Sequence, residues 1–317
     1  MNIKILLIGC GNIGFRHLEG LLKTDLSLDI SIIEISKARI KEQIKKIKKK
    51  KFKNKKIFFS SCFSIKRLKF DLVICATTAY KRYNLLKKLV SRYYFPKVLI
   101  EKVAFQNTYD FEKALKLFNK EKIQCWVNCP RREYKIYKQI KMENKIIDRM
   151  SIDVSGNKWN LASNSVHIFD LFYFLVNIPV NFSKKKVDLK KIPSKHNKFF
   201  ELYGKLKIKD EKYNISMSNQ RKSNGFIIKI KTSKTKYYID EIKNFVRVNS
   251  NNKTYTKKIN IPLQSQCTKS LIKKIIYDKK ILLPTLSEAY LSHKLLYSSF
   301  KKFLYIKKGE SLNRLIT

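Results

Sequence analysis

The sequence predicts an N-terminal α/β domain with a doubly wound parallel sheet over residues 1–127, followed by an α+β domain with a mostly antiparallel sheet over 128–317. The chain has 317 residues, which exceeds the usual size of a single domain. Up to about residue 128, apolar runs alternate with helix-like segments, which is typical of a parallel sheet covered on both faces. Beyond Pro130, segments of alternating polar and apolar residues succeed one another, which is typical of an antiparallel meander.

Strands and helices alternate along the first domain. The segment 3–8, IKILLI, is continuously apolar, as expected for a parallel strand buried on both faces. In the second predicted helix Ile40, Ile44 and Ile47 are spaced four and three residues apart, so they share one face. The predicted strands are 3–8, 30–34, 57–61, 71–76, 97–102 and 123–128. The predicted helices are 15–23, 37–50, 85–90 and 108–120.

The second domain begins with a strand at 149–156, whose residues alternate between polar and apolar. Between about residues 199 and 248 the same alternation predicts a meander, separated by polar breaks such as Lys222-Ser223-Asn224-Gly225. Its clearest strands are 203–209, 213–218, 225–232 and 236–240. Two helices are predicted beside the sheet, at 164–175 and 285–304.

The chain is strongly basic, with 70 Lys and Arg against 24 Asp and Glu and a formal net charge of +46. Such a charge can follow phosphates on a nucleic acid, but Lys, Ile and Asn are raised together, as an AT-rich genome would produce. The lysines between residues 45 and 56 are therefore interpreted as a solvated face. No helix-turn-helix, RNA-recognition or zinc pattern is present, so no specific nucleic-acid partner is expected. An anionic small substrate would benefit from the positive field.

The six cysteines contain no C-x-x-C pair, so neither a disulfide framework nor a metal site is expected. The apolar start of the chain is short and leads directly into glycines, which favours a first strand over a signal peptide. No segment approaches the roughly 20 apolar residues that cross a bilayer. The sequence thus predicts a cytoplasmic protein without a membrane partner.

A glycine motif, GCGNIG at residues 9–14, joins the first strand to the first helix. Gly9 permits a tight turn, Gly11 lets a pyrophosphate approach the backbone, and Gly14 allows close packing of helix on strand. The helix N-terminus offers amide donors to the anion. These features predict a Rossmann dinucleotide site. The expected cofactor contacts in the loop are Gly9, Gly11, Asn12, Ile13 and Gly14.

Glu34 lies 20 residues beyond Gly14, at the end of the second predicted strand. A carboxylate at this position accepts hydrogen bonds from the adenosine ribose and repels a 2′-phosphate, which predicts NAD as the cofactor. Ser36, Lys37 and Arg39 follow closely, and they leave NADP as an alternative.

In its motifs the sequence resembles the Gfo/Idh/MocA (glucose–fructose oxidoreductase / inositol dehydrogenase) family over nearly the whole chain. Glu101-Lys102 resembles the family's Glu-Lys-Pro motif, with Val103 in place of the proline. The other matching segments are GCGNIGFRH (9–17), DLVICATTAY (71–80), NCPRR (128–132) and LPTLSEAYLSHKLL (283–296). The order and spacing of these segments carry the resemblance.

The resemblance implies which residues form the sites. Lys102 and His167 would be catalytic and would converge on the substrate beside the nicotinamide. The family places an aspartate four residues before this histidine, but here that position holds Ser163. Implied substrate contacts are Arg131, Ser163, Asn164 and Asp170, and further cofactor contacts are Thr77, Thr78, Glu101 and Lys102.

The resemblance also implies the activity. The expected function is NAD(P)-dependent oxidation or reduction of a secondary alcohol or ketone on a sugar, sugar acid or nucleotide sugar, in a homo-oligomer and with surface-glycan biosynthesis as one setting. Independently of the family, a lysine or histidine with a shifted pKa suits the proton transfer that accompanies hydride transfer. The alternatives to these catalytic roles are that Lys102 is a solvated surface residue and that His167 is a buried structural residue. Ser163 keeps open a non-catalytic NAD-binding regulator or assembly protein of the same fold.

Overall fold

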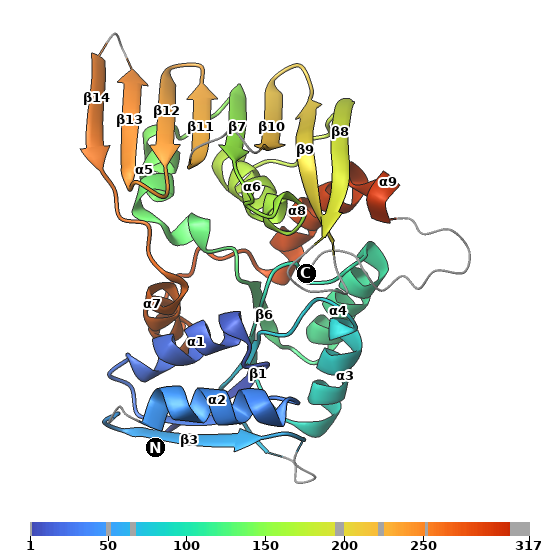
Figure 1. Ribbon diagram of the computed structural model, residues 1–317, viewed down its shortest axis with the longest axis vertical. Helices are drawn as coiled ribbons and strands as arrows, with labels where there is room; N and C mark the ends of the chain where they lie inside the picture. Colours follow the sequence, from blue (N-terminus) through green and yellow to red (C-terminus); the bar gives the residue numbers. More distant parts are fainter. Residues whose placement is uncertain are drawn as a thin grey trace. The chain divides into compact units, whose positions relative to one another are not determined.

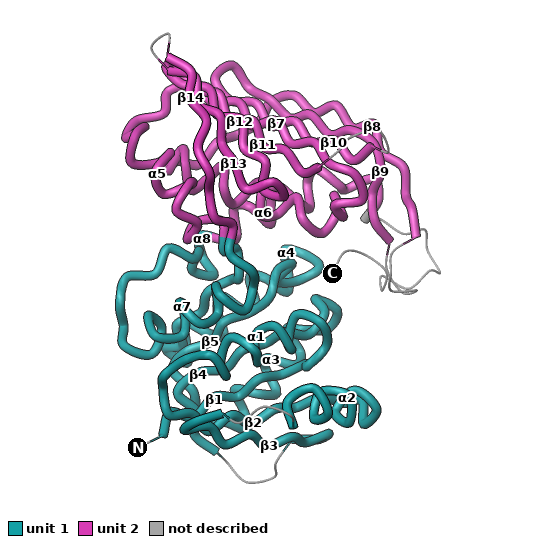
Figure 2. The backbone as a smooth tube through the Cα atoms, turned by 60° about the vertical axis from the view of Figure 1, so that its left-hand side comes forward, with its two compact units in different colours: residues 1–130, 262–288 teal, residues 131–261, 289–317 magenta. Residues whose placement is uncertain are grey.

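The computed structural model describes residues 2–48, 52–63, 68–193, 200–220, 225–250 and 253–304. It divides the chain into two compact units, which Figure 2 shows in different colours. The first unit comprises Met1–Pro130 and Pro262–Glu288, and the second comprises Arg131–Ile261 and Ala289–Thr317. The first unit therefore extends to residue 130, past the predicted boundary at residue 127. It also contains residues 262–288, which the sequence analysis placed in the second domain.

The first unit contains a six-stranded parallel sheet of order β3-β2-β1-β4-β5-β6. This confirms the predicted Rossmann-type domain, because the order reverses beside β1 as in doubly wound folds. Its strands are β1 Ile3–Ile8, β2 Leu28–Ile33, β3 Lys55–Ser60, β4 Leu72–Cys75, β5 Lys97–Ile100 and β6 Gln124–Val127. Its helices are α1 Asn12–Leu22, α2 Lys37–Lys48, α3 Arg82–Arg92, α4 Thr108–Lys120 and α7 Gln264–Ile276. A short 3-10 turn, Pro130–Glu133, follows β6 where the chain passes from the first unit to the second.

Helix α7 comes from the distant segment 262–288 and packs against α1. The two helices approach closely at Gly20, where an added Cβ would lie 2.5 Å from Thr268 Cβ and 2.6 Å from Ser265 O. Figure 1 shows α7 beside α1. The sequence analysis missed this helix, although Cys267, Leu271 and Ile275 form its buried face.

The second unit contains an eight-stranded sheet of order β14-β13-β12-β11-β7-β10-β9-β8 (Figure 1). All pairs are antiparallel except β7 with β10, so the predicted mostly antiparallel sheet is confirmed. The strands are β7 Met150–Gly156, β8 Lys184–Pro193, β9 Phe200–Lys209, β10 Tyr213–Asn219, β11 Phe226–Thr232, β12 Thr235–Asp240, β13 Phe245–Ser250 and β14 Lys253–Lys258.

Helix α6, Leu161–Val176, packs on β9 and β10 and contacts α5, Lys135–Glu143. The predicted helix 285–304 is two helices, α8 Leu286–Ser299 and α9 Lys301–Leu304. The prediction of a continuous meander was wrong in one respect, because β7 lies between β11 and β10 in the sheet. The predicted turn at 222–225 and the end of the predicted helix 37–50 fall largely outside the described residues.

Candidate functional site

The three motif glycines meet different structural requirements in the β1–α1 loop. Gly9 has a φ of +80°, in the left-handed region that favours glycine. At Gly14 an added Cβ would lie 1.9 Å from Gly9 O, so only glycine fits. Gly11 has an ordinary φ of −67°, and the nearest atom to an added Cβ is Arg39 Nη1 at 3.9 Å. The backbone at Gly11 is thus open to a ligand, which fits a dinucleotide pyrophosphate.

Helix α1 begins directly after this loop at Asn12, and Gly11 precedes its first turn. Asn12 and Ile13 are both exposed, Ile13 by 46%. Exposed amides at a helix N-terminus bind anions, because the first turn leaves N–H groups without intrahelical acceptors. The loop can therefore hold a phosphate group.

Glu34 follows β2 and is buried beside the same loop. Its Oε2 accepts from the Cys10 N–H at 2.8 Å, and its Oε1 accepts from the Ser36 N–H at 3.0 Å. Arg39 Nη1 lies 3.2 and 3.3 Å from the two carboxylate oxygens. Burial, with help from Glu34, raises the pKa of the Cys10 thiol to about 12, so this cysteine stays protonated and inert.

Lys102 follows β5, and its neighbour Glu101 is anchored in the interior of the first unit. Glu101 Oε1 lies 2.8 Å from His17 Nε2 and accepts from Asn128 Nδ2 at 2.5 Å. His17 Nδ1 in turn lies 2.9 Å from Thr268 Oγ1 on α7. Burial alone would raise the pKa of Glu101, but His17, Asn128 and Lys102 outweigh it and hold that pKa below its usual value. The Glu101 carboxylate therefore remains an anion and fixes the segment that carries Lys102.

Arg82, at the start of α3, holds the same segment from its other side. Its guanidinium donates to the carbonyl oxygens of Glu101, Val103 and Ala104, and to Thr77 O. The Arg82 side chain is fully buried. The sequence analysis missed this residue, because one arginine among 70 basic residues gives no local signal.

The ends of β1, β4 and β5 lie level in the sheet, since Ile8 pairs with Cys75 and Cys75 with Ile100. The glycine loop, the Thr77–Thr78 turn and Lys102 therefore emerge at one edge. Thr77 is partly exposed, Thr78 is exposed and Lys102 is partly exposed. In open α/β sheets ligands bind at this carboxyl edge, so the structure brings the predicted cofactor residues of the first unit together there.

In the second unit, α6 carries three of the predicted residues. Ser163 is buried, while Asn164 and His167 are partly exposed. Ser163 Oγ donates to Glu201 Oε1 at 2.6 Å, and Asn164 Nδ2 donates to Trp159 O at 2.6 Å. Lys102 and His167 belong to different units.

Asp170 and Arg131, both predicted substrate contacts, are engaged in ion pairs, a buried one for Asp170 and a partly buried one for Arg131. Arg132 donates to both oxygens of the fully buried Asp170, at 2.9 and 2.7 Å. Arg131 binds Glu241 through two hydrogen bonds of 2.9 and 2.6 Å. Burial would lower the pKa of Arg131, but Glu241 outweighs it and raises that pKa. These contacts stabilise the sheet and α6, and the substrate roles of both residues stay predictions.

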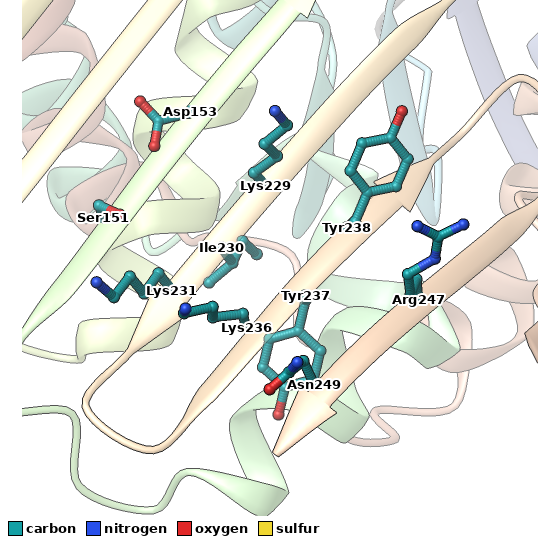
Figure 3. A pocket seen from close by; sticks show the side chains of 10 residues that line it. All are labelled: Ser151, Asp153, Lys229, Ile230, Lys231, Lys236, Tyr237, Tyr238, Arg247 and Asn249. Atoms are coloured by element: carbon teal, nitrogen blue, oxygen red, sulfur yellow. The ribbon is translucent and has the colours of Figure 1, made fainter. Parts of the chain in front are cut away.

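A separate hollow lies on the sheet of the second unit, over β7, β11, β12 and β13 (Figure 3). Its side chains are mainly cationic and aromatic, and none is a predicted site residue. The lining residues are Ser151, Asp153, Lys229, Ile230, Lys231, Lys236, Tyr237, Tyr238, Arg247 and Asn249. Across the described ranges, no three His, Cys, Asp or Glu residues gather as a metal site. In that same part of the chain, no helix has the length and apolarity to cross a membrane.

Residues 3–129 match the model of an oxidoreductase family with an NAD-binding Rossmann fold. Comparison with curated proteins gives no match.

Among solved structures, the fold is similar to that of a dehydrogenase (MviM) from Clostridium difficile, with 16% identity and a TM-score of 0.72 over 95% of this chain and all of that one. It is also similar to a UDP-N-acetylglucosamine 3-dehydrogenase from Acidithiobacillus ferrooxidans, with 9% identity and a TM-score of 0.67 over 94% and 97% of the chains. A super-repressor mutant of Gal80p from Saccharomyces cerevisiae has 12% identity and a TM-score of 0.68 over 95% and 96%. These likenesses support the fold of both units.

Proposed function

Because the chain belongs, through residues 3–129, to the Gfo/Idh/MocA family of NAD-binding oxidoreductases, we propose that it interconverts a secondary alcohol and a ketone on a sugar, sugar acid or nucleotide sugar. One observation carries the proposal. Lys102 follows β5 at the same sheet edge as the glycine loop after β1, so an acid–base group stands where the cofactor would bind. NAD, when bound, accepts or returns the hydride.

The proposed chemistry assigns each side chain a task. Lys102 takes the proton from the reacting hydroxyl, or returns it to the ketone oxygen in the reverse direction. A bound nicotinamide cation lowers the pKa of a neighbouring lysine, which suits this task near neutral pH. His167 relays the proton or holds the hydroxyl, and Ser163 and Asn164 orient the substrate by hydrogen bonds.

The substrate class rests on charge and on one similar fold. The net charge of +46 favours an anionic substrate, and one structure of the same fold is a UDP-N-acetylglucosamine 3-dehydrogenase. We therefore propose a nucleotide sugar or sugar acid, with surface-glycan biosynthesis as the setting. The six free cysteines support a reducing, cytoplasmic location, and by analogy with the family we propose a homo-oligomer.

The direct test is NADH formation when the protein and NAD are incubated with nucleotide sugars, sugar acids and matched neutral sugars. We expect turnover on at least one anionic member of the panel and slower turnover on its neutral counterpart. If NAD binds but no sugar derivative is oxidised, and no ketone is reduced with NADH, the enzymatic proposal is wrong.

A second candidate function is a regulator that binds NAD without turning it over. Ser163 in place of the family aspartate favours it, and Gal80p, which has a super-repressor mutant, shares the fold. Tight NAD binding without hydride exchange on the same panel would favour this alternative.

We propose that NAD binds more tightly than NADP because Glu34 lies beside the glycine loop. Replacing Glu34 with serine is expected to narrow or reverse the preference, since it removes the repulsion of a 2′-phosphate. It also releases Arg39, whose side chain is 46% exposed, to bind that phosphate. Calorimetric titration of both cofactors measures the change.

The matched control is Glu34→Ser combined with Arg39→Ser, which removes the repulsion without offering a new cation. It should bind NADP more weakly than Glu34→Ser alone. Equal or tighter NADP binding by the unmodified protein would overturn the assignment of Glu34.

A further inference from the structure

The hollow on the sheet of the second unit is lined by cations that have no carboxylate partner. Its volume is about 280 Å³, close to the smallest pockets that hold small ligands, about 300 Å³. The cationic residues that line it are all exposed, and they are Lys229, Lys231, Lys236 and Arg247. Among the residues that the structure describes, no Asp or Glu oxygen lies within 4.0 Å of the charged nitrogens of these four side chains.

The strand registers arrange the four cations as two pairs. Lys231 is paired directly with Lys236 across β11 and β12, and Figure 3 shows the two side by side. Tyr238 is paired with Lys229 on one side and with Arg247 on the other. The two pairs are two residues apart along the strands, a distance of about 6.7 Å between Cα atoms.

We propose that this hollow binds the diphosphate group of a small molecule, with one phosphoryl group at Lys231 and Lys236 and the other between Lys229 and Arg247. The site lies in the second unit and shares no residue with the proposed enzymatic function. It therefore goes beyond that function and does not depend on it.

Repulsion between the cations is the physical reason for an anionic ligand. Like charges directly opposite each other on neighbouring strands are destabilising, and Lys231 and Lys236 are such a pair. A phosphoryl group between them replaces this repulsion with charge-assisted hydrogen bonds. The planar guanidinium of Arg247 suits a second phosphoryl group, to which it can donate two parallel hydrogen bonds. A diphosphate reaches both pairs of cations, whereas a single phosphate neutralises one.

One carboxylate borders the hollow and opposes an anion there. Asp153 on β7 is paired with Lys229 in the sheet and is partly exposed. Burial raises the pKa of Asp153, although Lys207 and Lys229 partly offset this. An ionised Asp153 repels a diphosphate in the hollow, so removal of this charge should strengthen binding.

A second copy of the chain is the other candidate occupant of this face, and the charges argue against it. In a two-fold dimer the same patch of each subunit meets itself. The four cations and the one carboxylate of the lining would then face the same set from the partner. Such juxtaposition of like charges opposes association, so the proposed homo-oligomer would leave this face open.

The experiment is calorimetric titration with inorganic pyrophosphate and, separately, with inorganic phosphate. We expect pyrophosphate to bind more tightly. The double variant Lys231→Gln and Lys236→Gln should weaken pyrophosphate binding by about 10-fold or more, because it removes two charged donors. The matched control is Lys184→Gln with Lys209→Gln, an exposed and directly paired couple on β8 and β9 that lies outside the hollow and should matter little. Asp153→Asn should tighten binding.

A local readout is also needed, because the glycine loop of the first unit offers another place for a phosphate. Acetylation of lysines by acetic anhydride, followed by peptide mass spectrometry, measures the reactivity of each amine. Pyrophosphate should protect Lys231 and Lys236 and leave Lys184 and Lys209 reactive. Uridine diphosphate is tested in parallel, and protection at lower concentration than pyrophosphate would identify a nucleotide as the source of the diphosphate.

Three results would overturn the site. Equal losses of pyrophosphate binding in the two double variants would show that only the diffuse charge of the sheet matters. Lys231 and Lys236 that are unreactive without any ligand would show that a second copy covers this face. Weaker binding after Asp153→Asn would show that the anion is not held in the hollow. Thermal unfolding of each variant checks that these exposed substitutions leave the fold intact.

Discussion

Replacement of Lys102 with methionine is expected to lower turnover by about 10²-fold or more while NAD affinity stays nearly unchanged, the usual scale for losing an acid–base group. Methionine keeps the length of the side chain but cannot take or give the proton. The backbone at this position is held independently, because His17 and Asn128 bind Glu101 and Arg82 binds the carbonyls around Lys102. The loss should therefore be chemical and not conformational.

Steady-state kinetics at saturating NAD, with a separate NAD titration, measure this effect. The matched control is Lys116→Met, the same substitution at an exposed position of α4, which should change neither quantity. His167→Asn should cost less than Lys102→Met if Lys102 is the principal base. A Lys102→Met enzyme with undiminished turnover would contradict the mechanism.

The sequence was most informative where the signal is local. The glycine loop, Glu34 and the alternation of strands and helices predicted the first unit, because each depends on residues close together in the chain. The strands β8 and β14 were missed for a physical reason. They form the two edges of the second sheet, and lysines at such edges discourage pairing with other chains. In β8 only Val187, Leu189 and Ile192 interrupt a mostly polar sequence, so the alternation that marks half-buried strands is weak.

The residues that support the candidate site were missed because their partners are distant in sequence. Glu201 is 38 residues from Ser163, and Thr268 is 251 residues from His17. No spacing rule connects such pairs, and only the fold brings them together. Asp170 illustrates the converse, since its position on α6 indicated a substrate contact while the fold pairs it with Arg132. Spacing along the chain therefore shows which residues share a local motif, but it does not show which distant side chains bind them.

Replacement of Gly11 with valine is expected to abolish NAD binding and leave a folded protein. The backbone at Gly11 has φ −67° and ψ −163°, which L-residues adopt without strain. Apart from the chain neighbours, the nearest atom to an added Cβ is Arg39 Nη1 at 3.9 Å, so the Cβ has room in the free protein. It would instead occupy the space where a pyrophosphate meets the backbone. Calorimetric titration with NAD and thermal unfolding separate the loss of binding from loss of structure.

Gly14→Ala is the matched control within the same loop, and it should fail in the opposite way. Its Cβ would lie 1.9 Å from Gly9 O and 2.8 Å from Gly9 C, so the loop and α1 must move apart. Overpacking of this kind costs about 1–3 kcal/mol or more of unfolding free energy, and the unfolding midpoint should fall. Gly11→Val should keep the midpoint of the unmodified protein while its NAD titration is flat. A Gly11→Val protein that binds NAD normally would show that the phosphate is held elsewhere, because no bulky side chain fits between this backbone and a bound pyrophosphate.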